Sequence, residues 1–233
     1  MLNITTWRDY TMSIRKTFDN QLHELSELFK SMGDLTLQAI EHSSDALLDH
    51  KVVISQQVIE NDDEINEYEF KIERDCYRLI ALQQPVANDL RMIASILKAT
   101  SDLERMGDHA VSIAKSSLVI ADSQRLPAIE EKIREMSVKV EAMVRDAIAA
   151  FFAKDAKAAK EIAERDHEVD ALYKQVHNDI VDEITAGDNA DLSESAAAYL
   201  SVASNYERLG DYTTNICERV LYMEDGNMVD LNA

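Results

Sequence analysis

Glycine and proline are scarce in this sequence, which has five glycines and two prolines among 233 residues. Both residue types interrupt helices, glycine through its conformational freedom and proline through its missing N–H group. Alternating runs of valine, isoleucine, threonine and tyrosine, which are typical of strands, are also missing. Because alanine, leucine, glutamate and lysine are abundant instead, the composition predicts an all-α protein.

Positive charge is also scarce. Twenty-four lysines and arginines stand against 44 aspartates and glutamates, which gives a formal net charge of −20. This balance argues against nucleic acid as a partner, because phosphate contacts need a basic surface. It argues equally against strong adsorption to anionic lipid. A solvated acidic surface is the simplest explanation of such a surplus, and the alternative is that some of the acids are concentrated to hold cations.

Long apolar runs and paired cysteines are absent as well. No apolar run approaches the roughly 18 residues needed to cross a bilayer, so we expect no direct membrane insertion. The first residues, MLNITTWRDY, lack the basic and then apolar segments of a secretory signal, so we expect a cytoplasmic protein. Cys76 and Cys217 lie far apart in helical stretches, and we expect both to be free thiols.

What is present is a helical pattern. Apolar residues repeat with a 3.6-residue period from Met12 onward, whereas residues 1–11 lack this period and are assigned to an N-terminal extension. Pro85 and Pro127 mark helix boundaries, and a turn containing Gly187 marks another. Six long helices are expected, at about residues 12–48, 54–84, 85–120, 127–153, 154–184 and 196–223. Their short connections indicate antiparallel bundles.

The two halves of the chain resemble each other. IENDDEIN at 59–66 matches AERDHEVD at 163–170 with an offset of 104 residues. LERMGDHAVSIA, which begins at Leu103, matches YERLGDYTTNIC, which begins at Tyr206, with an offset of 103. Two matches in the same order indicate an internal duplication. The expected architecture is therefore two tandem three-helix bundles, residues 12–120 and 125–225.

Each half places acids where apolar residues are expected. Leucines and valines spaced by seven residues predict a core-facing seam on the helix after Pro85, and Glu104 falls on that seam. Glu207 falls on the corresponding seam of the last helix, and Asp108 and Asp211 follow four residues later. A carboxylate moved away from water costs free energy unless something neutralises it, and like charges at this spacing repel each other.

Acids four residues apart are not evidence of a site by themselves, because a chain with 44 acidic residues contains several such pairs by chance. The adjacent Arg105 and Arg208 are poor partners, since consecutive helix residues point about 100° apart. The combination of seam position, neighbouring glycine and duplication is what indicates a site. Gly107 and Gly210 lie between the two acids of each pair, where we expect them to leave room for ions.

The preceding helices supply the other side of each site. Asp62 and Asn66 are four residues apart, as are Asp166 and Asp170. Residues 62 and 108 each lie 23 positions from Pro85, so an antiparallel hairpin places them opposite each other. Helical bundles build carboxylate metal sites from pairs of this kind. The sequence therefore predicts a cation site rich in carboxylates in each bundle.

These motifs resemble those of the PhoU family, the accessory regulators of bacterial phosphate-specific transport. LERMGDHA and YERLGDYT, DDEIN and DHEVD, QQPVANDLR, and the opening MSIRKTFDNQLHELSELFKSMG carry the resemblance, which spans Met12 to about Met223. It implies a cytoplasmic, non-enzymatic homodimer of paired three-helix bundles that binds divalent or trivalent metal ions, such as iron, zinc, manganese or magnesium. It also implies a role in repressing phosphate-starvation signalling by linking the ATPase subunit of the Pst phosphate transporter to a phosphate-sensor histidine kinase.

By the same resemblance, the metal-binding positions are Asp62, Asn66, Glu104, Asp108, Asp166, Asp170, Glu207 and Asp211. Asn66 departs from the pattern, because it keeps an oxygen ligand but lacks the charge of a carboxylate. The first set is formally −3 and the second −4. Because affinity for hard cations rises with ligand charge, we expect the second bundle to bind divalent ions more tightly than the first, or to hold more of them.

Two other functions fit parts of the sequence. A ferritin-like dimetal oxidase needs an ExxH motif on two helices, and this chain has one, from Glu164 to His167. The corresponding residues of the first half, Glu60 to Asp63, contain no histidine. The other alternative is a metal-free helical scaffold in which protein donors satisfy the buried acids.

Overall fold

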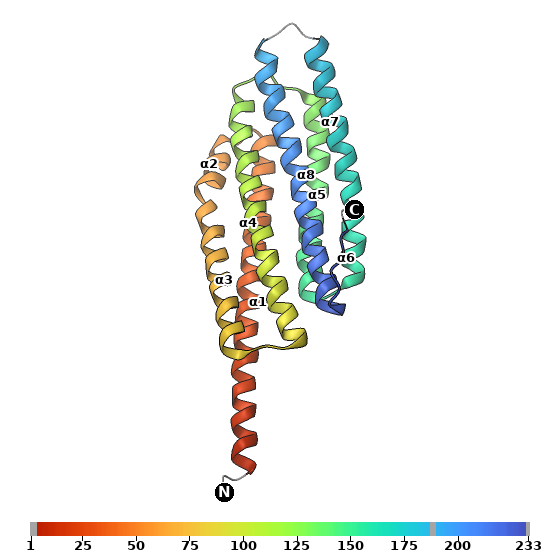
Figure 1. The fold of residues 1–233 in the computed structure, drawn as a ribbon. Helices are drawn as coiled ribbons and strands as arrows, with labels where there is room; N and C mark the ends of the chain where they lie inside the picture. The colour runs from red at the N-terminus through yellow and green to blue at the C-terminus, as the bar shows by residue number, and fades with distance from the viewer. Residues whose placement is uncertain (1–3, 187–189, 232–233) are drawn as a thin grey trace.

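The structure is a computed structural model that describes residues 4–186 and 190–231. Residues 1–3 of the expected extension and the expected turn at Gly187 lie outside the described residues. Eight helices and their connections make up the described part of the chain, without a strand, which confirms the all-α prediction (Figure 1). Their bounds are α1 Ile4–Leu48, α2 Val52–Glu60, α3 Asp62–Gln83, α4 Ala87–Ala121, α5 Pro127–Ala153, α6 Ala156–Ala163, α7 Asp166–Ala186 and α8 Ala190–Asp225.

The helices differ from the expected six in four places. The first begins at Ile4 rather than Met12, and the last begins at Ala190 rather than at about residue 196. The second and fifth are interrupted, at Asn61 and after Ala163. Asn61 has φ −89° and ψ 0°, a local departure from helical geometry. Such a short break leaves the apolar stripe almost in phase, so periodicity alone does not reveal it. Both breaks come immediately before the acids Asp62 and Asp166.

The two halves repeat the same order of helices and run in opposite directions. In Figure 1, α4 runs antiparallel to α8, and α1 runs antiparallel to α5. Equivalent residues of the two halves meet at this interface. The Arg145 Nη2 atom lies 2.6 Å from the Glu41 Oε1 atom, and the rings of His109 and Tyr212 stack at 5.5 Å. The members of these pairs are 104 and 103 residues apart, which indicates a pseudo-twofold relation between the halves.

One hydrophobic core runs through both halves. The ring centroids of Phe29 and Phe151 are 4.7 Å apart, and the buried Tyr206 hydroxyl forms a 2.8 Å hydrogen bond with Ser44. The largest cluster of buried apolar residues contains side chains from seven of the eight helices, all except α2. The duplicated halves are therefore joined by packing.

The predicted core-facing seam of α4 is correct at Val111, which is buried, and wrong at Leu90 and Glu104. Its buried stripe follows Ile93, Ile96, Leu103 and Met106, whereas Glu104 is half-buried beside it and Leu90 is 40% exposed. A seven-residue repeat drifts by about 20° per heptad on a straight helix, and α4 is covered from several sides by α1, α3 and α8. Glu104 therefore borders a groove that solvent reaches.

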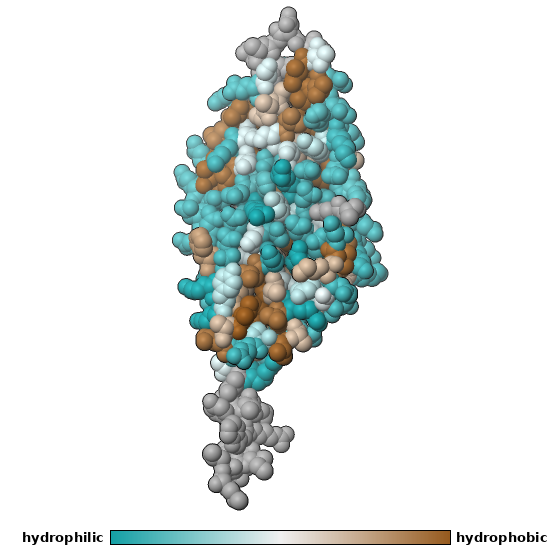
Figure 2. Space-filling view, in the orientation of Figure 1, coloured by the Kyte–Doolittle hydropathy of each residue, from teal (hydrophilic) through white to brown (hydrophobic). Residues whose placement is uncertain are grey.

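The surface is predominantly hydrophilic across the middle of the face shown in Figure 2, with apolar patches toward both ends. Exposed apolar side chains include Val53 on α2, Leu82 and Val86 around the α3–α4 turn, and Ile184 near the end of α7. In the part of the chain that the structure describes, no helix combines the length and the apolar character needed to span a membrane.

Candidate functional site

The first acidic groove lies between α3 and α4 and contains Asp62, Asn66, Glu104 and Asp108. The turn at Pro85 returns the chain, so the start of α3 lies beside the middle of α4. A Cβ atom added to Gly107 would lie 3.8 Å from the Asp62 Oδ1 atom. Asp62 thus stands across from the acidic motif of α4, as the spacing from Pro85 predicts.

The carboxylates of the first acidic groove repel one another. Partial burial raises the pKa of Asp62, and the charge of Asp108 adds to this shift, while a hydrogen bond with Asn66 opposes it. Burial also raises the pKa of Glu104, again with Asp108 as the next cause. Asn66 is therefore an internal partner for Asp62, a role that a carboxylate in its place cannot fill.

Glu69 is a further member of this groove and is not among the site residues predicted from the sequence. Burial raises its pKa, and Asp108 contributes in the same direction. Glu69 in turn raises the pKa of Glu104. Its position seven residues after Asp62 and three after Asn66 places it on the same helix stripe, a signal that spacing alone contained. With Glu69 included, the first acidic groove has four carboxylates rather than three.

The second acidic groove lies between α7 and α8 and contains Asp166, Asp170, Glu207 and Asp211. Asp166 is only 9% exposed, and its Oδ1 atom is buried without a hydrogen-bond partner. Burial, followed by the charges of Asp211, Asp170 and Glu207, raises the pKa of Asp166 to about 7. The other three acids predicted in this half therefore lie near the Asp166 carboxylate, whose Oδ1 atom has no hydrogen-bond donor among the described residues.

The other acids of the second groove share this environment. Burial and then Asp211 raise the pKa of Glu207, and burial and then Asp170 raise that of Asp211. Arg208 opposes both shifts. Asp170 is half-buried, and its Oδ2 atom lies 3.8 Å from Lys174 Nζ, a separation that leaves it weakly paired.

The two motif glycines make room for side chains of the facing helix. A Cβ atom at Gly210 would lie 2.1 Å from Asp166 Oδ1, and one at Gly107 would lie 3.0 Å from Ile65 Cδ1. Real Cβ atoms do not approach other atoms as closely as the first distance. The sequence predicts that these glycines leave space for ions. In the structure that space is taken by Asp166 in the second half and by Ile65 in the first.

The donors fit a hard cation in chemistry. They are carboxylate and amide oxygens, the ligands that such ions prefer, and the buried Asp166 Oδ1 atom lacks any protein donor. Among the described residues, no three histidine, cysteine, aspartate or glutamate side chains already stand in an arrangement that could hold a metal ion. Glu164 and His167, the single ExxH motif, are both exposed beside the α6–α7 break.

Comparisons with known proteins show the same two repeated halves of the chain. An all-α chain built from two copies of an acidic helical unit is the class that the fold and the grooves define. The PhoU domain model matches residues 29–117 and again residues 133–220. The chain therefore belongs to the PhoU family.

Individual relatives agree with this assignment. The phosphate-specific transport system accessory protein PhoU homolog of Streptococcus pneumoniae is 37% identical over 219 residues, which cover 94% of this chain and 100% of that protein. The Clostridium acetobutylicum homolog is 36% identical over 94% of this chain and 99% of its own length. The crystal structure of the phosphate transport system regulatory protein PhoU from S. pneumoniae superposes with a TM-score of 0.85 at 35% identity, covering 91% of this chain and 99% of that one. PhoU from Pseudomonas aeruginosa gives a TM-score of 0.86 at 33% identity, covering 90% and 100%.

Proposed function

We propose that this protein is a metal-binding regulator of phosphate uptake and phosphate-starvation signalling. In this proposal it is a cytoplasmic, non-enzymatic homodimer that links the ATPase subunit of the Pst phosphate transporter to the phosphate-sensor histidine kinase. The names of the relatives support the regulatory part, because they describe accessory and regulatory proteins of phosphate transport. The acidic grooves support the metal-binding part.

The observation that carries the metal proposal is Asp166. A buried carboxylate without a donor, surrounded by three further acids, is unfavourable unless a proton or a cation neutralises it. A divalent or trivalent ion, such as iron, manganese, zinc or magnesium, supplies that positive charge. The residues that would hold it in the second acidic groove are Asp166, Asp170, Glu207 and Asp211. In the first acidic groove they are Asp62, Asn66, Glu104 and Asp108.

The two grooves differ in how far protein donors already neutralise or hydrogen-bond their acids. The side-chain amide of Asn66 lowers the pKa of Asp62, which favours the metal-free scaffold for the first acidic groove. In the second acidic groove, no described residue donates a hydrogen bond to the Asp166 Oδ1 atom. Although Glu69 removes the difference in carboxylate number, we still expect the second acidic groove to fill first when metal is limiting.

Metal content after controlled loading tests this part. Protein stripped with a chelator is dialysed against iron, manganese, zinc or magnesium, and the bound metal per chain is measured with the melting temperature. The double variant Glu207→Ala, Asp211→Ala should lose the metal of the second acidic groove and remain folded. Asp182→Ala, Glu183→Ala is the matched control, because both residues are exposed on α7. Equal metal content in all three proteins, or none in any, would contradict the proposal.

Partner capture tests the regulatory part separately. Tagged protein from cells grown with abundant phosphate should recover the transporter ATPase subunit and the sensor kinase. A deletion strain should express a phosphate-starvation reporter constitutively, and the intact gene should restore repression. Sedimentation at several concentrations tests the homodimer. A strain that regulates the reporter normally without this gene would refute the regulatory role while leaving metal binding open.

A further inference from the structure

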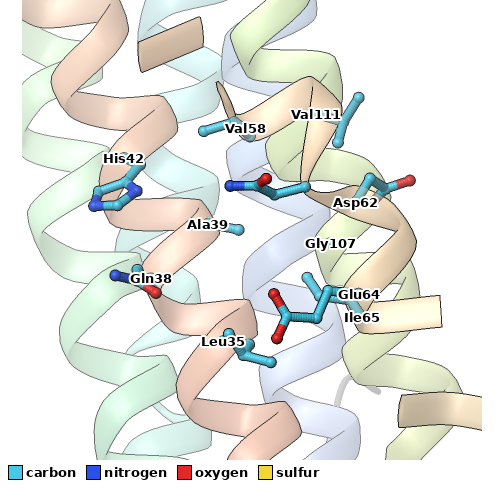
Figure 3. A pocket seen from close by; sticks show the side chains of 11 residues that line it. Leu35, Gln38, Ala39, His42, Val58, Asp62, Glu64, Ile65, Gly107 and Val111 are labelled. Carbon is cyan, nitrogen blue, oxygen red and sulfur yellow. The ribbon is translucent and has the colours of Figure 1, made fainter. Parts of the chain in front are cut away.

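A pocket of about 130 Å³ opens between α1, the α2–α3 break and α4. Figure 3 shows Gln38 and His42 of α1 on one side and Glu64 of α3 on the other, with the Glu64 carboxylate directed toward α1. Its walls are completed by Leu35, Ala39, Val58, Asn61, Asp62, Ile65, Gly107 and Val111. The pocket thus has an apolar floor and a rim of polar acceptors.

The internal duplication shows what the second half places at the same position. With the offset of 104, Leu35 corresponds to Lys139 and Glu64 to Glu168. The Lys139 Nζ atom lies 2.7 Å from the Glu168 Oε2 atom. This ion pair lowers the pKa of Glu168 and raises that of Lys139. An ammonium group of the chain itself therefore covers the α6–α7 break.

A second ion pair lies at the α6–α7 break. His42 corresponds to Asp146, and Asn61 corresponds to Arg165. The Arg165 Nη2 atom lies 2.7 Å from the Asp146 Oδ2 atom, so a guanidinium group also joins α5 to the α6–α7 break. In the second half, two cationic side chains thus connect the first helix of the bundle to the break.

The first half retains the acceptor and lacks both cations. Glu64 is present, but leucine and asparagine stand where the second half has Lys139 and Arg165. Among the described residues, Glu64 forms no ion pair, and no lysine or arginine side chain lines the pocket. The first half therefore has the Glu64 carboxylate at the edge of an open pocket. At the equivalent place in the second half lie the ammonium group of Lys139 and the guanidinium group of Arg165.

We propose that this pocket binds a protonated primary amine or a guanidinium group, which pairs with Glu64. Side-chain amides and an imidazole supply further acceptors for its N–H groups, and Ala39, Val58 and Ile65 contact the attached methylene groups. The pocket is roughly ten times the space that a single water needs, which suits a group of this size. The group comes either from a free small organic cation or from a lysine or arginine side chain of a partner protein.

Amide chemical shifts of the full-length, isotopically labelled protein test the site. Methylguanidinium chloride or n-butylammonium chloride is titrated against sodium chloride at equal ionic strength, with a chelator present so that bound metal plays no part. We expect saturable shifts concentrated around the α2–α3 break with a millimolar dissociation constant. Shifts that are not saturable, or that sodium chloride reproduces, would overturn the proposal.

Three variants make the test specific. Glu64→Gln should weaken binding at least fivefold, whereas Glu67→Gln, an exposed neighbour on α3, should leave it unchanged. Leu35→Lys should abolish binding, because it places an ammonium group beside Glu64 as Lys139 lies beside Glu168. Unchanged binding by Leu35→Lys or by Glu64→Gln would refute the assignment of the pocket.

The source of the group is distinguished in the same titration. Putrescine and agmatine represent free small cations, and acetylated, amidated lysine and arginine represent side chains of a partner. Tighter binding of the first pair identifies a small-molecule ligand, and tighter binding of the second identifies a protein side chain. Absence of binding by all four would count against the pocket. Because the titration uses metal-free protein, its failure would leave the metal proposal untouched.

Discussion

Asp166 is the residue at which burial and charge conflict most strongly. Its carboxylate is almost fully buried, has one oxygen without a donor, and stands among Asp170, Glu207 and Asp211. Its equivalent Asp62 is half-buried, and the side-chain amide of Asn66 lowers its pKa. The amide of Asn66 in place of a carboxylate is one difference between the two grooves, and substitutions at positions 66 and 166 test its effect.

Asp166→Asn should stabilise the metal-free protein at pH 8. The folded pKa of about 7 lies above the ordinary value of 3.8, so the folded protein binds the proton more tightly than the unfolded chain does. Stability contributed by this group is therefore full below about pH 4 and is lost as pH rises to about 7. The gain at pH 8 should be on the order of 1–3 kcal/mol, and smaller at pH 5.

Urea unfolding with a chelator present, at pH 5 and pH 8, measures this difference. Asp182→Asn, an exposed change on the same helix, is the matched control. An Asp166→Asn protein whose stability at pH 8 falls below that of the parent would show that another donor supports the ionised carboxylate.

Asn66→Asp should have the opposite effect in the first acidic groove. The change removes the donor to Asp62 and adds a like charge, so the metal-free protein should lose about 1 kcal/mol at pH 8. A bound divalent cation should restore the lost free energy of unfolding, because the cation stabilises the folded state alone. Thermal unfolding with and without manganese measures both effects, with Asn178→Asp on the exposed face of α7 as control. A loss that manganese fails to reverse would argue against a cation in this groove.

At the scale of elements, the close approach of α7 to α8 depends on Gly210. A helix usually gains about 1 kcal/mol when alanine replaces an interior glycine. Here the added Cβ atom would lie 2.1 Å from Asp166 Oδ1, so the carboxylate has to leave its position. Gly107 presents a milder case, because the terminal methyl of Ile65 needs to yield by only a few tenths of an ångström.

Gly210→Ala should therefore destabilise the protein, while Gly107→Ala should be nearly neutral. In an Asp166→Ala background the clash is absent, and Gly210→Ala should instead stabilise by about 1 kcal/mol. This double-mutant cycle, followed by chemical denaturation, isolates the interaction between the two residues. Additive effects in the cycle would mean that Asp166 is not what Gly210 accommodates.

At the scale of the whole molecule, the two halves share their core. Phe29 packs against Phe151, and Tyr206 of the last helix bonds Ser44 of the first. Antiparallel pairing of α1 with α5 and of α4 with α8 buries both faces. Each half expressed alone would expose a wide apolar surface, a property associated with aggregation rather than a stable monomer.

Unfolding of the full chain should accordingly be a single cooperative transition. Circular dichroism and the fluorescence of tyrosines should report the same midpoint in urea. A fragment that ends after α4 should be aggregated or lack fixed tertiary structure. Two separate transitions, or a fragment that folds as a stable monomer, would show that the halves are independent domains.

The sequence by itself determined the class of fold and the pairing of motifs across the duplication. Helix type follows from local periodicity, and the position of Asp62 opposite Asp108 follows from the equal distances of these two residues to Pro85. Both properties depend on local sequence or on a single turn, so they can be predicted from the sequence. The breaks at Asn61 and after Ala163 were not visible, because a short interruption barely shifts the apolar stripe.

Only the tertiary structure decided how exposed each acid is and what the glycines accommodate. Glu104 lies beside the buried stripe rather than on it, because four helices, α1, α2, α3 and α8, share the surface of α4. Glu69 joins the first acidic groove because the α3–α4 hairpin brings its helix stripe against Asp108 and Glu104. Gly210 faces a carboxylate rather than an open space, since helix spacing is fixed by all the contacts of the core. Burial and distance between helices are collective properties, and no single motif determines them.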